Sequence, residues 1–302
     1  MKKTNIQSPR NLFRLIELIG VTRSFSLPIY IGKNRHLKTV LRFLKSGKIL
    51  KDEGNFVAVY GKQKVLMNYL KNDDFFILEN LNNFESAGII ITVEDSEKII
   101  FRNDTRTLRF GSYDVVRALA ESFLDYKDLN VKDRFVIDVG AFLGDSMFYF
   151  WSQGAKKILA FEPFKNFYEI GNINILLNNL SNEIHLFNVG MGDRINEYDS
   201  NKDSASQKNL LPFVEMKTLI EKYNRENLPV VLKMDCEGCE YQVFRDEGGI
   251  KSLKSLGVVE FIMEYHAGDV SNLIKNLEKE NFSVFLKTKK SENIGILHGF
   301  LK

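Results

Sequence analysis

Hydrophobic and polar residues alternate in two different rhythms along the chain. Between residues 56 and 108, short apolar runs are separated by Asn, Asp and Gly, as in strands joined by turns. From residue 113 to residue 126, apolar residues recur at helical spacing, which predicts a helix. We therefore expect a β-rich N-terminal part, residues 1–110, and a second domain, residues 111–302. The strands expected in the first part are Phe56–Tyr60, Phe75–Leu78, Gly88–Val93 and Lys98–Phe101.

Strand-like and helix-like segments alternate in the second domain, which predicts a mostly parallel α/β sheet covered on both faces. The last two strands are joined by a short polar link and should form an antiparallel hairpin. The expected strands are Phe135–Val139, Lys157–Phe161, Ile184–Val189, Val230–Met234, Val258–Glu264, Phe282–Lys287 and Ile294–Leu301. The expected helices are Met147–Gln153, Asn166–Leu180, Val214–Tyr223 and Val270–Glu280.

A carboxylate and two glycines stand where the first of these strands ends, in the stretch FVIDVGAFLGD. Ligands of open α/β sheets bind beyond the carboxyl ends of the strands, and glycine lets the backbone approach them. Phe142 replaces the second glycine of the dinucleotide fingerprint, so a pyrophosphate is not expected. A carboxylate suits a cationic group, such as the ammonium or sulfonium of S-adenosylmethionine, although a purely structural turn is the alternative. The candidate ligand-binding residues here are Asp138, Gly140, Ala141, Gly144 and Asp145.

Two further strand ends fit an adenosine. Glu162 ends the next strand, about twenty residues after the glycines, where an acid accepts hydrogen bonds from both ribose hydroxyls. The third strand ends at Asn188 and Gly190, a polar and glycine-containing end that suits the edge of an adenine ring.

These strand ends resemble those of a known family, the FkbM-type S-adenosylmethionine-dependent methyltransferases. The resemblance covers roughly residues 111–302 and leaves out the N-terminal segment. It implies a Rossmann-like class I methyltransferase sheet, S-adenosylmethionine as cofactor, and a hydroxyl acceptor on a sugar, glycolipid or small natural product. The matching residues are Val136–Ala141, Gly144-Asp145, Phe161–Pro163, the stretch LKMDCEGCE at 232–240, and Glu264–His266.

Three residues near the ends of later strands are catalytic candidates. Asp235 is expected to hold the methionyl end of the cofactor or the acceptor hydroxyl, whereas pairing of Lys233 with Asp235 or Glu240 is the structural alternative. His266 is expected to act as the general base, because an unperturbed histidine pKa near ~6.5 allows proton acceptance at neutral pH. Asp235 is the rival base, and Glu264 is expected to orient the imidazole or bind the acceptor.

The two cysteines, Cys236 and Cys239, form a Cys-x-x-Cys motif. Two cysteines cannot build a disulfide framework, and the four histidines lack the paired spacing of a zinc site. We therefore expect no metal site and no redox role at the cysteines, and the sequence leaves open whether a divalent metal assists at Asp235.

Charge is unevenly distributed. Residues 1–50 hold eleven basic residues and one acid, a net +10, whereas the remainder holds 31 basic and 38 acidic residues, a net −7. This asymmetry predicts an anionic partner for residues 1–50, either nucleic acid or a lipid surface, unless it is simply a solvated basic face. An RNA ribose methyltransferase is therefore one alternative function, and a non-catalytic cofactor-fold binding module is another.

The chain contains no apolar run of the length that spans a bilayer and no signal-peptide core, so we expect a cytoplasmic protein without a transmembrane segment. The polar stretch between residues 195 and 211 is predicted to be a lid over the cofactor or a loop that contacts the acceptor, because long loops of this kind are usually functional or disordered.

Overall fold

The computed structural model describes residues 37–52, 55–67, 76–86, 88–95, 98–103, 106–111, 125–192, 210–211, 215–244 and 253–302, with single positions between 115 and 122. Contacts divide the chain into two compact units, residues 1–120 and 121–302. The division falls after Ala120, later than the expected boundary at residue 110. In the described ranges, no helix combines the length and hydrophobicity needed to cross a bilayer.

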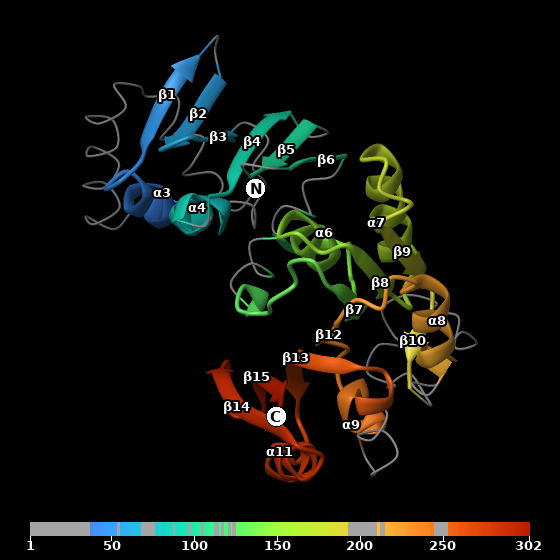
Figure 1. Cartoon of the computed structure of the whole chain (residues 1–302). Helices are drawn as coiled ribbons and strands as arrows, with labels where there is room; N and C mark the ends of the chain where they lie inside the picture. The colour runs from blue at the N-terminus through green and yellow to red at the C-terminus, as the bar shows by residue number, and fades with distance from the viewer. Residues whose placement is uncertain are drawn as a thin grey trace. The chain divides into compact units, whose positions relative to one another are not determined.

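The first unit contains a six-stranded sheet in sequence order, shown in blue to teal in Figure 1. All neighbouring strands pair antiparallel except β3 and β4, which are parallel. Its elements are α3 (Leu37–Phe43), β1 (Lys48–Asp52), β2 (Asn55–Tyr60), β3 (Gln63–Leu66), α4 (Phe76–Ser86), β4 (Ile90–Asp95), β5 (Lys98–Arg102) and β6 (Thr107–Phe110).

The elements of this unit differ from the sequence prediction in one wrong strand and three missed strands. The expected strand Phe75–Leu78 was wrong, because Phe76–Leu78 begin α4 and place Ile77, Leu81 and Phe84 in the core at helical spacing. The prediction also missed β1, β3 and β6. Strand β3 contains the fully buried Gln63. The Gln63 side chain donates to the Ile89 carbonyl at 2.5 Å and accepts from the Ile91 backbone N–H at 2.6 Å, so it joins β3 to the start of β4.

The second unit contains a seven-stranded sheet in the order β14-β15-β13-β12-β7-β8-β9. Strands β12, β13, β7, β8 and β9 are parallel, and β15 runs antiparallel between β13 and β14. If the strands are numbered from 1 to 7 in chain order and the sheet is read from β9, the order is 3-2-1-4-5-7-6. This is the order of the class I methyltransferase sheet, so the predicted α/β fold class is confirmed. The strands are β7 (Phe135–Val139), β8 (Lys157–Phe161), β9 (Ile184–Phe187), β12 (Val230–Met234), β13 (Val258–His266), β14 (Phe282–Lys289) and β15 (Ile294–Leu301).

Helices cover both faces of this sheet. Alternate β7 residues Phe135, Ile137 and Val139 share one apolar core with residues of α8, α9 and α11, while α6 contacts β7 and β8 outside that core. Such alternation follows from the two-residue period of a strand. The remaining elements are α6 (Asp145–Ser152), α7 (Lys165–Leu177), α8 (Met216–Tyr223), α9 (Cys239–Val243), α11 (Val270–Lys279) and a short parallel pair, β10 (Gly190–Met191) with β11 (Leu210–Leu211).

The order of the strands reverses between β7 and β12, the two parallel neighbours at the centre of the sheet. In open α/β sheets, a crevice for ligands forms at such a switch point, beyond the carboxyl ends of the strands. Asp138, at the end of β7, and Asp235, immediately after β12, are therefore at the position where the fold favours a ligand.

Candidate active site

Asp138 is fully buried and forms an ion pair with a lysine of the neighbouring strand. Lys233 Nζ lies 3.1 Å from Asp138 Oδ1, and Ser146 Oγ donates to Asp138 Oδ2 at 2.6 Å. Burial raises the pKa of Asp138, and the Lys233 charge and the Ser146 hydrogen bond oppose that shift. The structural alternative, a pairing of Lys233 with Asp235 or Glu240, is replaced by the pair with Asp138, because Lys233 and Asp138 are register partners on adjacent strands.

The turn after β7 is held close to the ends of two other strands. The backbone N–H groups of Gly140 and Ala141 both donate to the Phe161 carbonyl at 3.0 Å. Gly140 has a φ of +78°, and a Cβ atom at this position would lie 1.8 Å from the Asp235 carbonyl oxygen. Only glycine fits there, so the turn touches the loop that carries the catalytic candidate Asp235.

Gly144 and Asp145 start α6 and face the interior. Gly144 precedes the helix with a φ of +89°. The Asp145 carboxyl is buried and accepts a hydrogen bond from Ser122 Oγ. Burial raises the pKa of Asp145 to about 6. Asp145 therefore supports the turn from inside the protein in this structure.

Glu162 is buried directly after β8, with both carboxyl oxygens engaged by the backbone. Phe142 N–H donates to Oε2 and Phe164 N–H donates to Oε1, each at 2.8 Å. Burial raises the pKa of Glu162 to about 8, against the lowering effect of these two hydrogen bonds. Each oxygen keeps a second lone pair, so the carboxylate can still accept from two hydroxyls.

Asn188 and Gly190 follow β9. Asn188 Nδ2 donates to the backbone carbonyls of Glu162 at 3.0 Å and Pro163 at 3.1 Å. Its amide nitrogen therefore ties the end of β9 to the end of β8, which leaves its amide oxygen for an adenine. Gly190 is buried in β10, where it pairs with Leu210.

Phe142 is a site residue that sequence reasoning missed, because it was considered only as a substitute for a glycine. Its backbone has a φ of +48°, its ring is 43% exposed, and the ring packs against Phe167 with centroids 4.4 Å apart. A left-handed bulky residue is uncommon and is often found at ligand sites. The sequence feature that could have identified Phe142 is an aromatic residue between the two glycines of the turn, Gly140 and Gly144.

His266 ends β13 inside a cluster of carboxylates. Its Nε2 lies 3.5 Å from Glu264 Oε1, 3.6 Å from Glu237 Oε2 and 3.9 Å from Asp235 Oδ1. Its Nδ1 lies 3.6 Å from Glu240 Oε1. The structure therefore brings together all three catalytic candidates and adds Glu237 and Glu240.

These neighbours change the protonation expected for His266. Burial lowers its pKa, but hydrogen bonds to Glu240 and Glu264 and the charges of Asp235 and Glu237 raise it to about 10. The expectation of a pKa near ~6.5 was wrong. The carboxylates belong to the segment after β12 and to the end of β13, and the sequence did not predict that these two segments place their carboxylates around the imidazole. A pKa of about 10 favours the imidazolium form of His266 at neutral pH.

Two groups on other elements complete the cluster. Tyr126 Oη donates to Asp235 Oδ2 at 2.7 Å, which leaves Oδ1 facing His266. Lys290 Nζ lies 2.7 Å from both Glu264 Oε2 and Asp125 Oδ2. Sequence reasoning missed Tyr126, Asp125 and Lys290, since they are far from the strand-end motifs in the chain.

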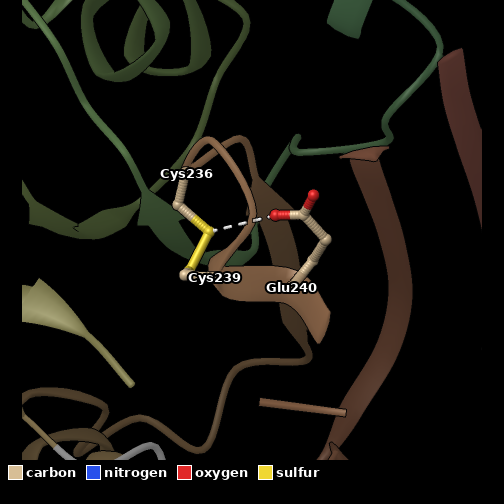
Figure 2. Close-up of side chains that lie close together, drawn as sticks. All are labelled: Cys236, Cys239 and Glu240. Atoms are coloured by element: carbon tan, nitrogen blue, oxygen red, sulfur yellow. Dashed lines mark hydrogen bonds between the residues drawn. A yellow bond between two sulfur atoms is a disulfide. The ribbon is translucent and has the colours of Figure 1, made fainter. Parts of the chain in front are cut away.

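Cys236 and Cys239 are joined by a disulfide, with Cα atoms 5.4 Å apart (Figure 2). The sequence did not predict this disulfide, which forms because the turn brings the pair within disulfide reach. The absence of a redox role stays a prediction. Glu240 Oε2 accepts from Gly238 N–H at 3.0 Å and lies 3.5 Å from Cys236 Sγ (Figure 2). Glu240 Oε1 accepts from His266 N–H at 2.7 Å, so the turn is tied to β13.

The predicted lid between residues 195 and 211 lies outside the described residues, apart from β11 at its end. The same is true of the basic segment up to residue 36.

Residues 138–284 match the model of the methyltransferase FkbM domain. No curated protein matches the chain. Among solved structures, the O-methyltransferase from Bacillus cereus in complex with SAH has 11% identity and a TM-score of 0.40, over 63% of this chain and 89% of that chain. Sp1610 of Streptococcus pneumoniae, a putative tRNA (m1A22) methyltransferase in complex with S-adenosyl-L-methionine, has 12% identity and a TM-score of 0.40, over 60% and 72%.

EvdMO1 has 11% identity and a TM-score of 0.39, and the match covers 63% of this chain but 41% of EvdMO1. At these scores the fold assignment rests on the strand order described above. The matched range contains every sequence-predicted site residue from Asp138 to His266. The likeness of this chain to the methyltransferase FkbM domain is therefore a likeness of residues 138–284, just under half of its length.

Proposed function

We propose that this protein transfers a methyl group from S-adenosylmethionine to a hydroxyl oxygen. The observation that carries the proposal is that the glycine turn and the acidic cluster share one sheet edge. Asp235 N–H donates to the Val139 carbonyl at 3.0 Å, and its own carbonyl oxygen leaves no room for a side chain at Gly140. A cofactor at the turn and an acceptor at the cluster would therefore be neighbours.

The cofactor side uses groups with the right chemistry for each part of S-adenosylmethionine. Glu162 accepts from the two ribose hydroxyls, and the Phe142 ring covers the sugar or the adenine. The negative cluster around Asp235 attracts the ammonium and the sulfonium. Asp138 and Asp145 act from inside, since Lys233 and Ser122 occupy their carboxyl groups.

The acceptor side aligns the hydroxyl and receives its proton. The oxygen attacks the methyl carbon, the carbon–sulfur bond breaks, and S-adenosylhomocysteine and a methyl ether are formed. Alignment of this kind lowers a barrier by roughly 7–11 kcal/mol. We assign proton acceptance to Asp235 Oδ1, the alternative that the sequence left open, because a protonated His266 has no free lone pair. An oxygen that has begun to bond to carbon is acidic enough for a carboxylate to deprotonate.

The acceptor class is a sugar, a glycolipid or another small hydroxyl-bearing molecule. The resemblance to FkbM-type enzymes supports this class, because their acceptors are often of that kind. RNA ribose is the second candidate, and the net charge of +10 over residues 1–50 favours it, since basic segments bind phosphate backbones.

The test is to incubate the full chain with S-adenosylmethionine labelled in the methyl group and with a cell extract separated into small molecules, glycans, lipids and RNA. We expect label in a glycan, lipid or small-molecule fraction as a methyl ether. Label in RNA ribose would support the second candidate. Binding of the cofactor without transfer to any fraction would favour a non-catalytic binding module.

A further inference from the structure

We propose that Asp235, Glu237 and His266 bind a divalent cation such as Mn²⁺ on the acceptor side of the site. This inference rests on the proposed function only for its role, because cation binding can be measured without any methyl transfer. The sequence analysis named no metal ligand and left open whether a divalent metal assists at Asp235.

The geometry of the three side chains suits a cation. One ligand atom from each of Asp235, Glu237 and His266 lies within 4.8 Å of the other two. His266 Nε2 is 3.9 Å from Asp235 Oδ1 and 3.6 Å from Glu237 Oε2. Two ligand atoms that bind one ion at ordinary bond lengths are at most about 4.3 Å apart. Small side-chain movements are therefore enough to close the three atoms around an ion.

The other side of the imidazole is supported as metal-binding histidines usually are. Such histidines turn their second ring nitrogen to a carboxylate or carbonyl, which fixes the orientation of the ring. Here Nδ1 lies 3.6 Å from Oε1 of Glu240, a fully buried carboxylate. Glu240 is itself fixed by the backbone N–H groups of Gly238 and His266. The set is therefore a histidine with an anchored carboxylate on its Nδ1 side and three carboxylates, Asp235, Glu237 and Glu264, on its Nε2 side.

The donor set also points to the kind of ion. Carboxylate oxygens suit Mg²⁺, Ca²⁺ and Mn²⁺, whereas imidazole suits later divalent transition metals, so a mixed set favours Mn²⁺ or a similar ion. The side chains of Glu237 and Asp235 are 68% and 27% exposed, which leaves the ion open to water or to an acceptor. A bound cation would displace the Nε2 proton of His266 and take Asp235 Oδ1 as a ligand. It would then polarise an acceptor hydroxyl, and the hydroxyl proton would pass to water and not to Asp235.

The test uses the full chain after treatment with a chelator and removal of the chelator. Calorimetric titration with Mn²⁺ alone should show one saturable site. Glu237→Gln and His266→Gln should each weaken its affinity tenfold or more. His185→Gln is the matched control, since it removes an imidazole of β9 that stacks on Tyr223 outside the cluster, and its affinity for Mn²⁺ should equal that of the wild type.

The same preparations then separate this inference from the proposed function. Absence of Mn²⁺ binding, or binding that both cluster variants retain, overturns the cation site, whether or not methyl transfer occurs. Binding that depends on Glu237 and His266 supports the site even if no acceptor fraction takes up label, in which case only the proposed function fails. Circular dichroism of each variant must match that of the wild type, so that a lost site is not a lost fold.

Discussion

Glu162 is a carboxyl group whose ionisation is disfavoured by burial. Burial raises its pKa to about 8, above the usual 4.5. A carboxyl with a raised folded-state pKa makes the folded protein less stable as pH rises from its usual pKa through the raised one. A protein that keeps such a group gains something else from it, and cofactor binding is the gain that we propose.

Glu162→Gln should therefore separate affinity from stability. We expect S-adenosylmethionine to bind more weakly by roughly 1.5–3 kcal/mol, the scale of hydrogen bonds to a charged group. Above pH 8 the variant should unfold at a higher temperature than the wild type, because it has no carboxyl to ionise. Calorimetry and thermal unfolding measure the two effects. Glu226→Gln, at an exposed residue, should change neither, and unchanged cofactor affinity in Glu162→Gln would remove Glu162 from the site.

The affinity for S-adenosylmethionine should also depend on pH. Ribose hydroxyls donate to the ionised carboxylate, so binding at pH values below about 8 requires Glu162 to lose a proton. We expect the affinity to rise between pH 6 and pH 8 and then to level off, with protons released on binding. Titrations in buffers of different ionisation enthalpy measure this release. An affinity that falls over the same interval would contradict the role of Glu162.

His266 belongs to the acceptor side, so its loss should affect turnover more than cofactor affinity. We expect His266→Gln to lower kcat by roughly 10²–10³-fold, the scale for one electrostatic group at a reacting centre, with little change in affinity for S-adenosylmethionine. The wild-type rate should show no fall through pH 6.5, since the cluster holds the pKa of His266 at about 10. A rate that falls through pH 6.5 and loses that fall in the variant would instead identify His266 as the base.

The turn between β7 and α6 depends on one glycine. A Cβ at Gly140 would meet the Asp235 carbonyl at 1.8 Å, a backbone atom that cannot move aside. We expect Gly140→Ala to reduce the melting temperature and to abolish S-adenosylmethionine binding. Gly111→Ala is the matched control, because a Cβ there meets no atom within 4 Å. A Gly140→Ala protein with wild-type binding would show that the turn is not built as described.

Several elements of the second unit could be predicted to the residue, and the reason is visible in their ends. Strands β7, β8 and β12 are mostly apolar runs, and a glycine or a polar residue follows each of them. The change of residue type marks where each strand ends. In contrast, the run Phe75–Leu78 is short and continuously apolar, a pattern that fits a buried strand and the start of a helix equally well. The segment is helical in the structure because the helix buries both Ile77 and Leu81 in the core.

The candidate site could be predicted where its residues follow strands, and not where they meet across the fold. Asp235, Glu264 and His266 were expected at one sheet edge, and the structure places them there. Tyr126 contacts Asp235, and Lys290 contacts Glu264. Both partners are more than twenty residues away from these carboxylates in the chain, so no spacing in the sequence predicts the contacts. The protonation of His266 depends on such contacts, and for this reason its pKa was mispredicted.

At the scale of the molecule, every described residue of the site lies between Ser122 and Lys290, within the second unit. Its main apolar core is likewise formed by residues from Phe135 to Leu297. A chain shortened to residues 111–302 should therefore fold and bind S-adenosylmethionine with the affinity of the full chain. Calorimetry on both chains measures this. Loss of binding in a shortened chain with an unchanged circular dichroism spectrum would show that residues 1–110 contribute to the cofactor site.

The central claim is that Asp235, beside the cofactor turn, serves methyl transfer to a hydroxyl group. The most direct measurement is the rate at which label from S-adenosylmethionine enters the hydroxyl acceptor fraction, with the wild type and Asp235→Asn compared at saturating cofactor. We predict transfer by the wild type and a rate roughly 10²–10⁴-fold lower in the variant, the scale of general-base catalysis, although the variant still binds cofactor. Equal rates in the two proteins, or no transfer by a wild type that binds the cofactor, would contradict it.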